Sequence, residues 1–227
     1  MDHVTIRANG AAFHVARTGS GRPLLLLHGW PEFWLTWKPV MARLADRYSL
    51  IAPDLRGHGD SDWTKGGSYA LTEYVYDLAQ LVRSIAASDV TLIGHSMGGK
   101  VAQLMASRQP AGLAGLILVA PSPPQPMSIP AEAREMMAGA YATRDSVEAT
   151  IDNVLTAKPL TAEDREQVIA DSLRGASPAK IAWPRATSLE DITEQVGAIG
   201  VPTMVIAGEL DRIDSPELLR AEMISRV

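Results

Sequence analysis

The chain has no cysteine among its 227 residues, which excludes disulfide bonds, thiolate metal sites and a cysteine nucleophile. Positive charge is also scarce: 21 Lys and Arg stand against 26 Asp and Glu, for a net charge of −5. That balance argues against a nucleic acid or an anionic membrane as a partner. No apolar run approaches the about 20 residues of a membrane-spanning helix, and the N-terminus lacks the pattern of a signal peptide. We therefore expect a cytoplasmic protein.

Hydrophobic residues make up 46% of the chain and charged residues 21%, as in soluble proteins with a sizeable core. Continuous apolar runs, typical of strands buried on both faces, alternate with stretches of helical spacing. The expected strands are 23–27, 48–52, 90–93, 113–119 and 201–207, after a hairpin of strands 5–7 and 12–16; the expected helices are 36–46, 74–87, 100–108 and 216–225. The pattern predicts an α/β fold with a mostly parallel, doubly wound sheet.

The alternation is interrupted at Pro121, the first of five prolines within ten residues. No strand-like run follows between about 131 and 196. Helical spacing indicates helices at 131–142, 146–155, 162–173 and 188–196. We therefore expect two parts: a sheet-containing core, residues 1–124 and 197–227, and a helical cap or lid, residues 125–196, over the carboxyl ends of the strands.

The stretch 94–99, Gly-His-Ser-Met-Gly-Gly, lies between an expected strand and an expected helix. A serine with glycines two residues before and after it, in this context, is the pattern of a nucleophile elbow. The turn is so tight that its neighbours must be nearly free of side chains, and it lifts the serine oxygen above the sheet. Ser96 is therefore the candidate nucleophile.

Three further motifs follow expected strands, and with the elbow they make the whole chain resemble the α/β-hydrolases. Residues 28–31 are His-Gly-Trp-Pro, residues 54–61 are Asp-Leu-Arg-Gly-His-Gly-Asp-Ser, and residues 208–211 are Gly-Glu-Leu-Asp. The four motifs occur in the order of that family, each at the carboxyl end of a strand. The 54–61 motif is interpreted as a turn-rich structural loop, with Arg56 and the acids making local hydrogen bonds.

The resemblance implies a role for each site residue. Ser96 attacks a carbonyl carbon, and the backbone N–H groups of Trp30 and Met97 stabilise the resulting oxyanion. Asp211 is the acid that orients a catalytic histidine, whereas Asp214 and Glu209 are expected to be solvated.

His28 is interpreted mainly as a brace for the oxyanion loop. His28 and Trp183 are also candidates for the substrate pocket. His95, next to the nucleophile, is expected to be a packed neighbour. We expect neither a metal nor a cofactor, because no His, Asp or Glu cluster has ligand spacing and no glycine-rich loop precedes a lysine.

The expected base is missing from the sequence. The family places its histidine after the acid, but the last histidine of this chain is His95. The favoured explanation is a shortened form of a longer hydrolase, without the last strand, the histidine loop and the closing helix, so that this chain is inactive. The alternatives are a ligand-binding protein that has lost its base, and a different arrangement with His28 or His95 as the base.

The nucleophile indicates the reaction. Residues 28–34 are similar to epoxide hydrolases and dehalogenases, which use an aspartate whose alkyl ester water can hydrolyse. Alkylation of Ser96 would give an ether that water does not cleave, so acyl transfer to water is favoured. Tryptophans and the methionines of the cap favour a small, largely apolar ester as substrate. The elbow also resembles cofactor-free haloperoxidases or perhydrolases, and carbon–carbon and lactone hydrolases share the core. The oligomeric state is left open.

Overall fold

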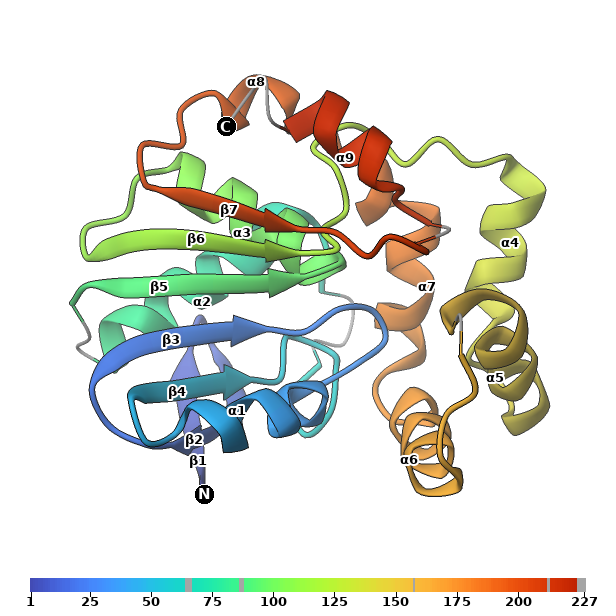
Figure 1. Ribbon diagram of the computed structural model, residues 1–227, viewed down its shortest axis with the longest axis horizontal. Coiled ribbons are helices and arrows are strands. Elements are labelled where there is room, and N and C mark those ends of the chain that lie inside the picture. Colours follow the sequence, from blue (N-terminus) through green and yellow to red (C-terminus); the bar gives the residue numbers. More distant parts are fainter. Residues whose placement is uncertain (64–66, 86–87, 157, 212, 224–227) are drawn as a thin grey trace.

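The computed structural model describes residues 1–63, 67–85, 88–156, 158–211 and 213–223. Seven strands in that part of the chain form one sheet in the order β1-β2-β4-β3-β5-β6-β7 (Figure 1). The strands are β1 (Asp2–Ala8), β2 (Ala11–Thr18), β3 (Arg22–Leu27), β4 (Tyr48–Pro53), β5 (Val90–His95), β6 (Leu113–Val119) and β7 (Thr203–Ile206). The predicted strands are therefore confirmed, each with slightly different ends.

The sheet is parallel from β4 to β7. β3 pairs in parallel with both β4 and β5, and the pairs β5·β6 and β6·β7 are also parallel. Only the N-terminal hairpin β1·β2 and its junction with β4 are antiparallel. Consequently the carboxyl ends of β3, β4, β5 and β7, where the four motifs begin, lie along one edge of the sheet (Figure 1).

Helices cover both faces of this sheet, and β3 shows how. Leu24 and Leu26 belong to a core cluster that includes Trp37 and Met41, in and before α1 (Lys38–Leu44). Leu25 and Leu27 belong to the larger cluster, beneath α2 (Leu71–Ser84) and α3 (Met97–Ser107). Successive side chains of a strand point to opposite faces, so a run of four leucines fits a strand that is buried on both sides.

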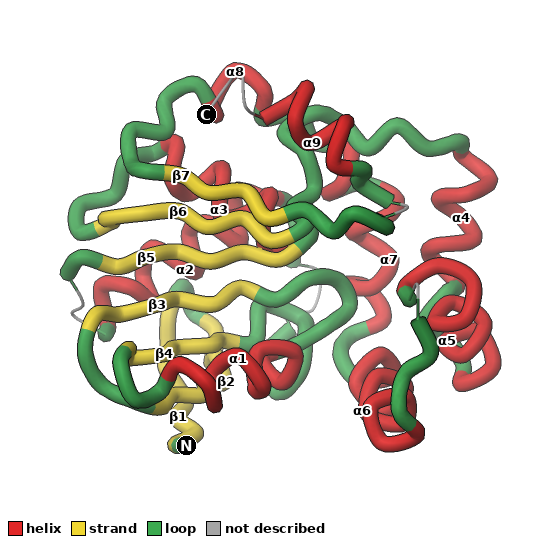
Figure 2. Tube along the Cα trace, in the orientation of Figure 1, coloured by secondary structure: helices red, strands yellow, loops and turns green. Residues whose placement is uncertain are grey.

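A helical segment follows β6 and lies beyond the carboxyl ends of the strands (Figure 2). Its helices are α4 (Ala131–Gly139), α5 (Arg144–Thr150), α6 (Ala162–Leu173) and α7 (Ser177–Arg185), and a π-helical turn, Ile151–Leu155, extends α5. The segment has a small core of its own around Tyr141, Val147, Ile151 and Ile169.

One prediction in this segment is wrong. In place of a helix over 188–196 the chain forms a short 3-10 turn, Thr187–Leu189, and the single turn α8 (Thr193–Val196). The extended backbone at Glu190 separates the two. The helix α7, which the sequence did not predict, contains Pro178 in its first turn and Pro184 inside it. Proline is compatible with a first helical turn but obscures a helix when it occurs in the interior.

The last described helix is α9 (Pro216–Met223). The rest of the predicted helix, residues 224 and 225, lies outside the described residues, as do 86 and 87 of the predicted helix 74–87. Among the helices that are described, none combines the length and the apolar character needed to cross a bilayer.

Candidate active site

The turn between β5 and α3 holds Ser96 in a conformation that L-residues avoid, with φ 49° and ψ −117°. Close backbone contacts explain the glycines around it. A Cβ on Gly94 would lie 2.4 Å from the carbonyl oxygen of Gly98, and a Cβ on Gly98 would lie 2.4 Å from that of His28. Such strain persists only where the surroundings enforce it, and it is characteristic of active sites. Ser96 itself is half-buried.

His28 connects the loops that follow β3 and β4. Its Nδ1 donates to the carbonyl oxygen of Gly29 (2.7 Å), and its Nε2 accepts from the backbone N–H of Leu55 (2.9 Å). The ring is fully buried, and burial lowers its pKa. The geometry is that of a brace. A substrate-contacting role for His28 has no exposed surface to work through, and neither nitrogen is free to take a proton.

Trp30 links this loop to the helical segment. Its Nε1 donates to the carbonyl oxygen of Lys180 in α7 (3.0 Å), and its ring stands edge-on to that of Tyr141, with centroids 4.8 Å apart. The peptide bond between Trp30 and Pro31 is cis. Met97 begins α3 and is buried. The roles of Trp30 and Met97 as backbone donors to an oxyanion stay predictions.

An ion pair that the sequence did not reveal lies beside the nucleophile. Oε2 of Glu32 accepts from the backbone N–H of Gly29 (2.9 Å) and pairs with Nδ1 of His95 (3.0 Å). His95 is therefore not simply a packed neighbour. The two residues are 63 positions apart, so no local pattern could have indicated the contact.

The pair shifts both pKa values. Burial opposes the ionisation of Glu32, but the charge and hydrogen bond of His95 and the Gly29 N–H outweigh it and lower the pKa to about 2. Burial would lower the pKa of His95, but the charge and hydrogen bond of Glu32, together with the charge of Asp211, raise it. Asp211 is thus within electrostatic reach of the residue that precedes Ser96.

Asp211 follows β7 and is held by the backbone around it. Its Oδ1 accepts from the N–H groups of Ile213 (2.9 Å) and Asp214 (3.1 Å). Asp214 is buried, contrary to the expectation that it is solvated, whereas Glu209 is exposed. Burial, and then the charge of Asp211, raise the pKa of Asp214 to about 7, although Lys100 opposes this. The sequence could not show that the chain turns inward after Asp211.

Two other buried residues belong to the framework of the site. Trp183 in α7 is only 2% exposed and packs in the main core, so it offers no surface to a substrate. Lys100, in the first turns of α3, is buried as well. Its Nζ donates to the carbonyl oxygens of Gln125 (2.7 Å) and Ser188 (3.3 Å), near the two ends of the helical segment.

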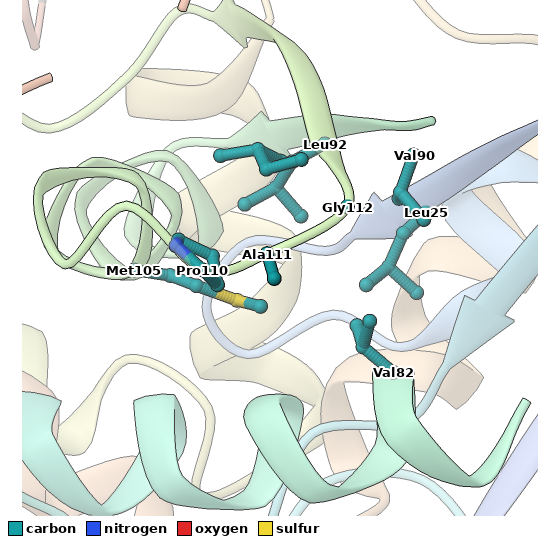
Figure 3. A pocket seen from close by; sticks show the side chains of 9 residues that line it. Leu25, Val82, Val90, Leu92, Met105, Pro110, Ala111 and Gly112 are labelled. Atoms are coloured by element: carbon teal, nitrogen blue, oxygen red, sulfur yellow. The ribbon is translucent and has the colours of Figure 1, made fainter. Parts of the chain in front are cut away.

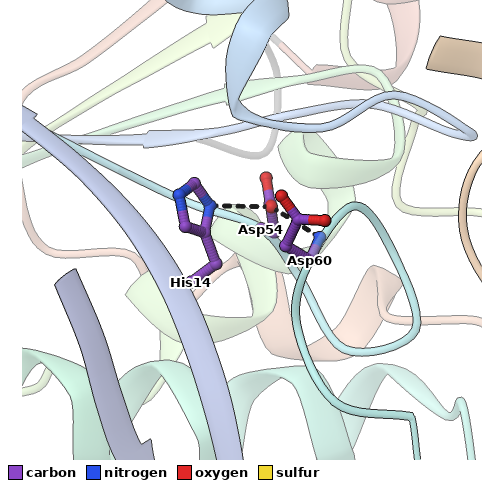
Figure 4. Close-up of side chains that lie close together, drawn as sticks. All are labelled: His14, Asp54 and Asp60. Atoms are coloured by element: carbon purple, nitrogen blue, oxygen red, sulfur yellow. Dashed lines mark hydrogen bonds and ion pairs between the residues drawn. The ribbon is translucent and has the colours of Figure 1, made fainter. Parts of the chain in front are cut away.

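The 54–61 loop brings together a group that sequence spacing did not reveal. His14, Asp54 and Asp60 have potential ligand atoms within 4.8 Å of one another (Figure 4). The carboxylate of Asp54 already accepts from His14 Nδ1 and from the N–H groups of Trp34 and Asp60, so the group is held by the protein's own hydrogen bonds. Arg56 is also structural, but it pairs with Asp77 in α2 rather than with acids of its own loop.

Cavities elsewhere in the fold do not involve Ser96. An apolar cavity of about 10 Å³ is lined by Leu25, Val90 and Leu92 among others (Figure 3). It lies where β5 begins, at the opposite end of that strand from Ser96, and is too small for a substrate. An open groove of about 340 Å³ runs along α2, α3 and α8 on the outside of the molecule.

Comparison with known proteins identifies hydrolases. A family model described as serine aminopeptidase, S33, matches residues 22–225. A soluble epoxide hydrolase of a Corynebacterium species is 43% identical over 102 residues, which are 45% of this chain and 35% of that protein. Epoxide hydrolase 4 of Mus musculus is 38% identical over 120 residues, which are 52% of this chain and 33% of that protein. The chain thus spans about a third of the length of the curated relatives that it matches.

Solved structures share the fold over almost the whole chain. An esterase from Exiguobacterium antarcticum superposes with a TM-score of 0.90 at 23% identity, covering 98% of this chain and 87% of that one. A bromoperoxidase from Bacillus anthracis has a TM-score of 0.87 at 19% identity, covering 98% and 88%. A thermophilic esterase from Thermogutta terrifontis has a TM-score of 0.78 at 27% identity, covering 98% and 85%.

Proposed function

Because the chain belongs to the serine aminopeptidase S33 family of α/β-hydrolases, we propose that its reaction is the cleavage of a small, largely apolar carboxylic ester through an acyl-serine intermediate. The observation that carries the proposal is the conformation of Ser96. A serine held with φ 49° and ψ −117° on a turn from strand to helix, half-buried at the carboxyl edge of the sheet, has the geometry of an exposed nucleophile.

The residues around Ser96 supply the remaining steps. Ser96 Oγ attacks the ester carbonyl carbon while its proton passes to a base. The carbonyl oxygen becomes an oxyanion, which the backbone N–H groups of Trp30 and Met97 stabilise. The bond between carbon and the alkoxy oxygen then breaks, the alcohol leaves with the proton, and water hydrolyses the acyl-serine by the same route. Asp211 orients the base and stabilises its charged form.

The base is proposed to lie on a segment that packs against β7. None of the chain's five histidines, all of which are described, is placed for the role. Both nitrogens of His28 are bonded, His95 is paired with Glu32, and the other three lie away from Ser96. Met204 and Ile206 of β7 are 58% and 48% exposed, unlike the corresponding residues of inner strands. A covering strand and helix would bury them. We therefore propose that this chain alone is close to inactive.

The helical segment 125–196 is proposed to act as a cap over the substrate. The hydrogen bond from Trp30 to Lys180 in α7 joins that segment to the loop that supplies an oxyanion donor. The edge of the Trp30 ring against Tyr141 makes this contact apolar, which favours an ester with a hydrophobic acyl or alcohol group.

The test compares this chain with its Ser96→Ala variant in the hydrolysis of 4-nitrophenyl butyrate. We expect slow hydrolysis by the chain alone and a Ser96-dependent increase of about tenfold when imidazole is added, because imidazole can replace a missing general base. The same imidazole concentration with the variant gives the uncatalysed background. Equal rates for the two proteins under both conditions would exclude Ser96 as the nucleophile. Rapid turnover without imidazole would contradict the missing base.

Epoxide opening is the second candidate, since curated relatives that are 38–43% identical are epoxide hydrolases. An alkyl ether on Ser96 would be a dead end, so this chain would react once and stop. Intact-mass analysis separates the candidates: an ester gives an acyl adduct that disappears with time, whereas an epoxide would give a permanent one. A ligand-binding protein without chemistry would give neither, and a perhydrolase would oxidise bromide when peroxide and a carboxylic acid are supplied.

A further inference from the structure

The Glu32 carboxylate lies where the oxyanion loop, defined as residues 28–31, meets the turn that carries the nucleophile. One oxygen, Oε2, receives two donors from different parts of the fold: the Gly29 N–H of that loop and the His95 Nδ1 of the turn. A hydrogen bond from the Glu32 N–H to the carbonyl oxygen of Gly29 (3.2 Å) closes the loop on itself. The carboxylate therefore connects the loop to the residue immediately before Ser96.

The contact is close as well as polar. A Cβ built on Gly29 would lie 2.9 Å from His95 Nδ1, 3.1 Å from Glu32 Oε2 and 3.2 Å from the Cβ of Ser96. The three side chains thus converge on a single backbone position of the oxyanion loop. No side chain other than hydrogen fits at Gly29 without displacing one of them.

We propose that Glu32 is a positioning residue, which holds the Trp30 N–H of the oxyanion loop at a fixed distance from Ser96 and Met97 by joining Gly29 to His95. The inference rests on the proposed function, because it assigns Glu32 to the reaction that Ser96 carries out. Oxyanion donors act only when they are aimed at the position of the developing charge, and misplacement by about 1 Å costs much of the rate.

A purely structural role fits the surroundings of the pair less well. The side chains of Glu32 and His95 are each 29% exposed, and neither belongs to a core cluster. The ion pairs that hold the surface together, such as Arg144 with Glu166, lie far from the nucleophile and join helices only. The Glu32 pair is the one described ion pair that joins the oxyanion loop to the elbow.

The test measures how a fluorophosphonate reacts with Ser96 in the full chain, in imidazole buffer, for wild type, Glu32→Gln, Glu32→Ala and the control Glu166→Gln. Glu32→Gln keeps an oxygen that can accept from Gly29 but loses the charge that pairs with His95. We expect the rate constant of phosphonylation at saturation to fall about tenfold in Glu32→Gln and further in Glu32→Ala, with little change in reagent affinity. Glu166→Gln should match wild type. Equal rate constants for Glu32→Gln and wild type, both folded, would overturn the inference.

A second readout is independent of reactivity. In ¹H–¹⁵N spectra, Glu32→Gln should shift the Trp30 and Met97 amide resonances, and Glu166→Gln should not. Unmoved Trp30 and Met97 resonances would overturn the inference even if Ser96 reacts. Failure of wild type to react at Ser96, with the shifts present, would instead contradict the proposed function and leave the joining role of Glu32 supported.

Discussion

Ser96 is strained because residues on three other segments leave its backbone no alternative. The carbonyl oxygen of Gly98 faces Gly94, the carbonyl oxygen of His28 faces Gly98, and Pro121 faces Gly99. Each contact is with backbone or with a rigid ring, so none can move aside cheaply. The strain at Ser96, of order 1–3 kcal/mol, is therefore maintained by the packing of β3, β5 and α3 against one another.

A methyl group at Gly98 should disturb this arrangement. Gly98→Ala would place a Cβ 2.4 Å from the His28 carbonyl oxygen, and the backbone shift should lower the free energy of unfolding by about 2 kcal/mol. Gly139→Ala is the matched control: nothing lies within 4 Å of its Cβ, and the residue ends α4, so it should be neutral or slightly stabilising. Urea unfolding measures both. A Gly98→Ala variant as stable as wild type would contradict the packing argument.

The ion pair beside Ser96 gives stability a defined pH dependence. The folded-state pKa of Glu32 is lowered from 4.5 to about 2, so its contribution is present above about pH 4.5 and is lost as the pH falls towards 2. At 1.36 kcal/mol per pH unit the contribution is about 3 kcal/mol. His95 has a raised pKa, so its contribution is complete below pH 6.5 and is lost as the pH rises through the folded-state value.

Urea unfolding of wild type and Glu32→Gln at pH 7 and pH 3 checks this prediction. Since wild-type Glu32 is partly protonated in the unfolded and folded chains at pH 3, the difference in unfolding free energy should narrow by about half relative to pH 7. Glu166→Gln, which removes a carboxylate that is 60% exposed, should show a small difference at both pH values. A Glu32→Gln difference that does not change with pH would contradict the pKa assignment.

Sequence patterns predict those residues whose role depends on local spacing. The elbow around Ser96 and the bracing role of His28 belong to this group, since each lies in a short motif after a strand. The pair of Glu32 and His95 does not, because a contact across 63 positions depends on how β3 and β5 pair. The burial of Asp214 likewise depends on a turn after β7, and no spacing rule predicts it.

At the scale of elements, Lys100 connects α3 to both ends of the helical segment. Its ammonium group donates to the carbonyl oxygens of Gln125 and Ser188, and the Met127 N–H donates to the same Ser188 oxygen (2.9 Å). Burial is the main reason that the pKa of Lys100 is lowered to about 8. The helical segment is therefore anchored on the helix that begins at the nucleophile.

Lys100→Met should loosen that anchor with little effect on overall stability. The variant loses two hydrogen bonds, but it also removes the cost of burying an ammonium group, so the unfolding free energy should change by less than about 2 kcal/mol. Hydrogen exchange at Met127 and neighbouring amides should become faster. Lys38→Met, at an exposed position that starts α1, should leave exchange there unchanged. Unaltered exchange in Lys100→Met would contradict the anchoring role.

Element prediction succeeds where the hydrophobic period is clear. All seven strands, and helices such as α2 and α6, follow from apolar runs or helical spacing. It fails at α7 because prolines at 178 and 184 resemble breaks in a helix, and at 188–196 because the apolar residues there serve the main core. Ile192 is buried in that core and its N–H donates to the Pro124 carbonyl oxygen, so tertiary packing determines the local backbone.

At the scale of the whole molecule, the sheet gathers every candidate site residue at one edge. Parallel pairing of β3, β5 and β7 with their neighbours brings the oxyanion loop, the elbow and Asp211 to the same side, and the helical segment lies beyond that side (Figure 1). The sequence predicts this convergence from the order of the motifs alone. It does not predict the exposure of Met204 and Ile206 on β7, because that depends on which segment lies next to the strand.

The measurement that tests the account most directly is the mapping of a fluorophosphonate adduct on the intact chain by peptide mass spectrometry, in imidazole buffer, with Ser96→Ala as the control. The account predicts a single adduct, on Ser96, whose formation is accelerated by imidazole and absent from the variant. An adduct on another residue, or equal labelling of wild type and Ser96→Ala, would contradict the assignment of Ser96 as the nucleophile.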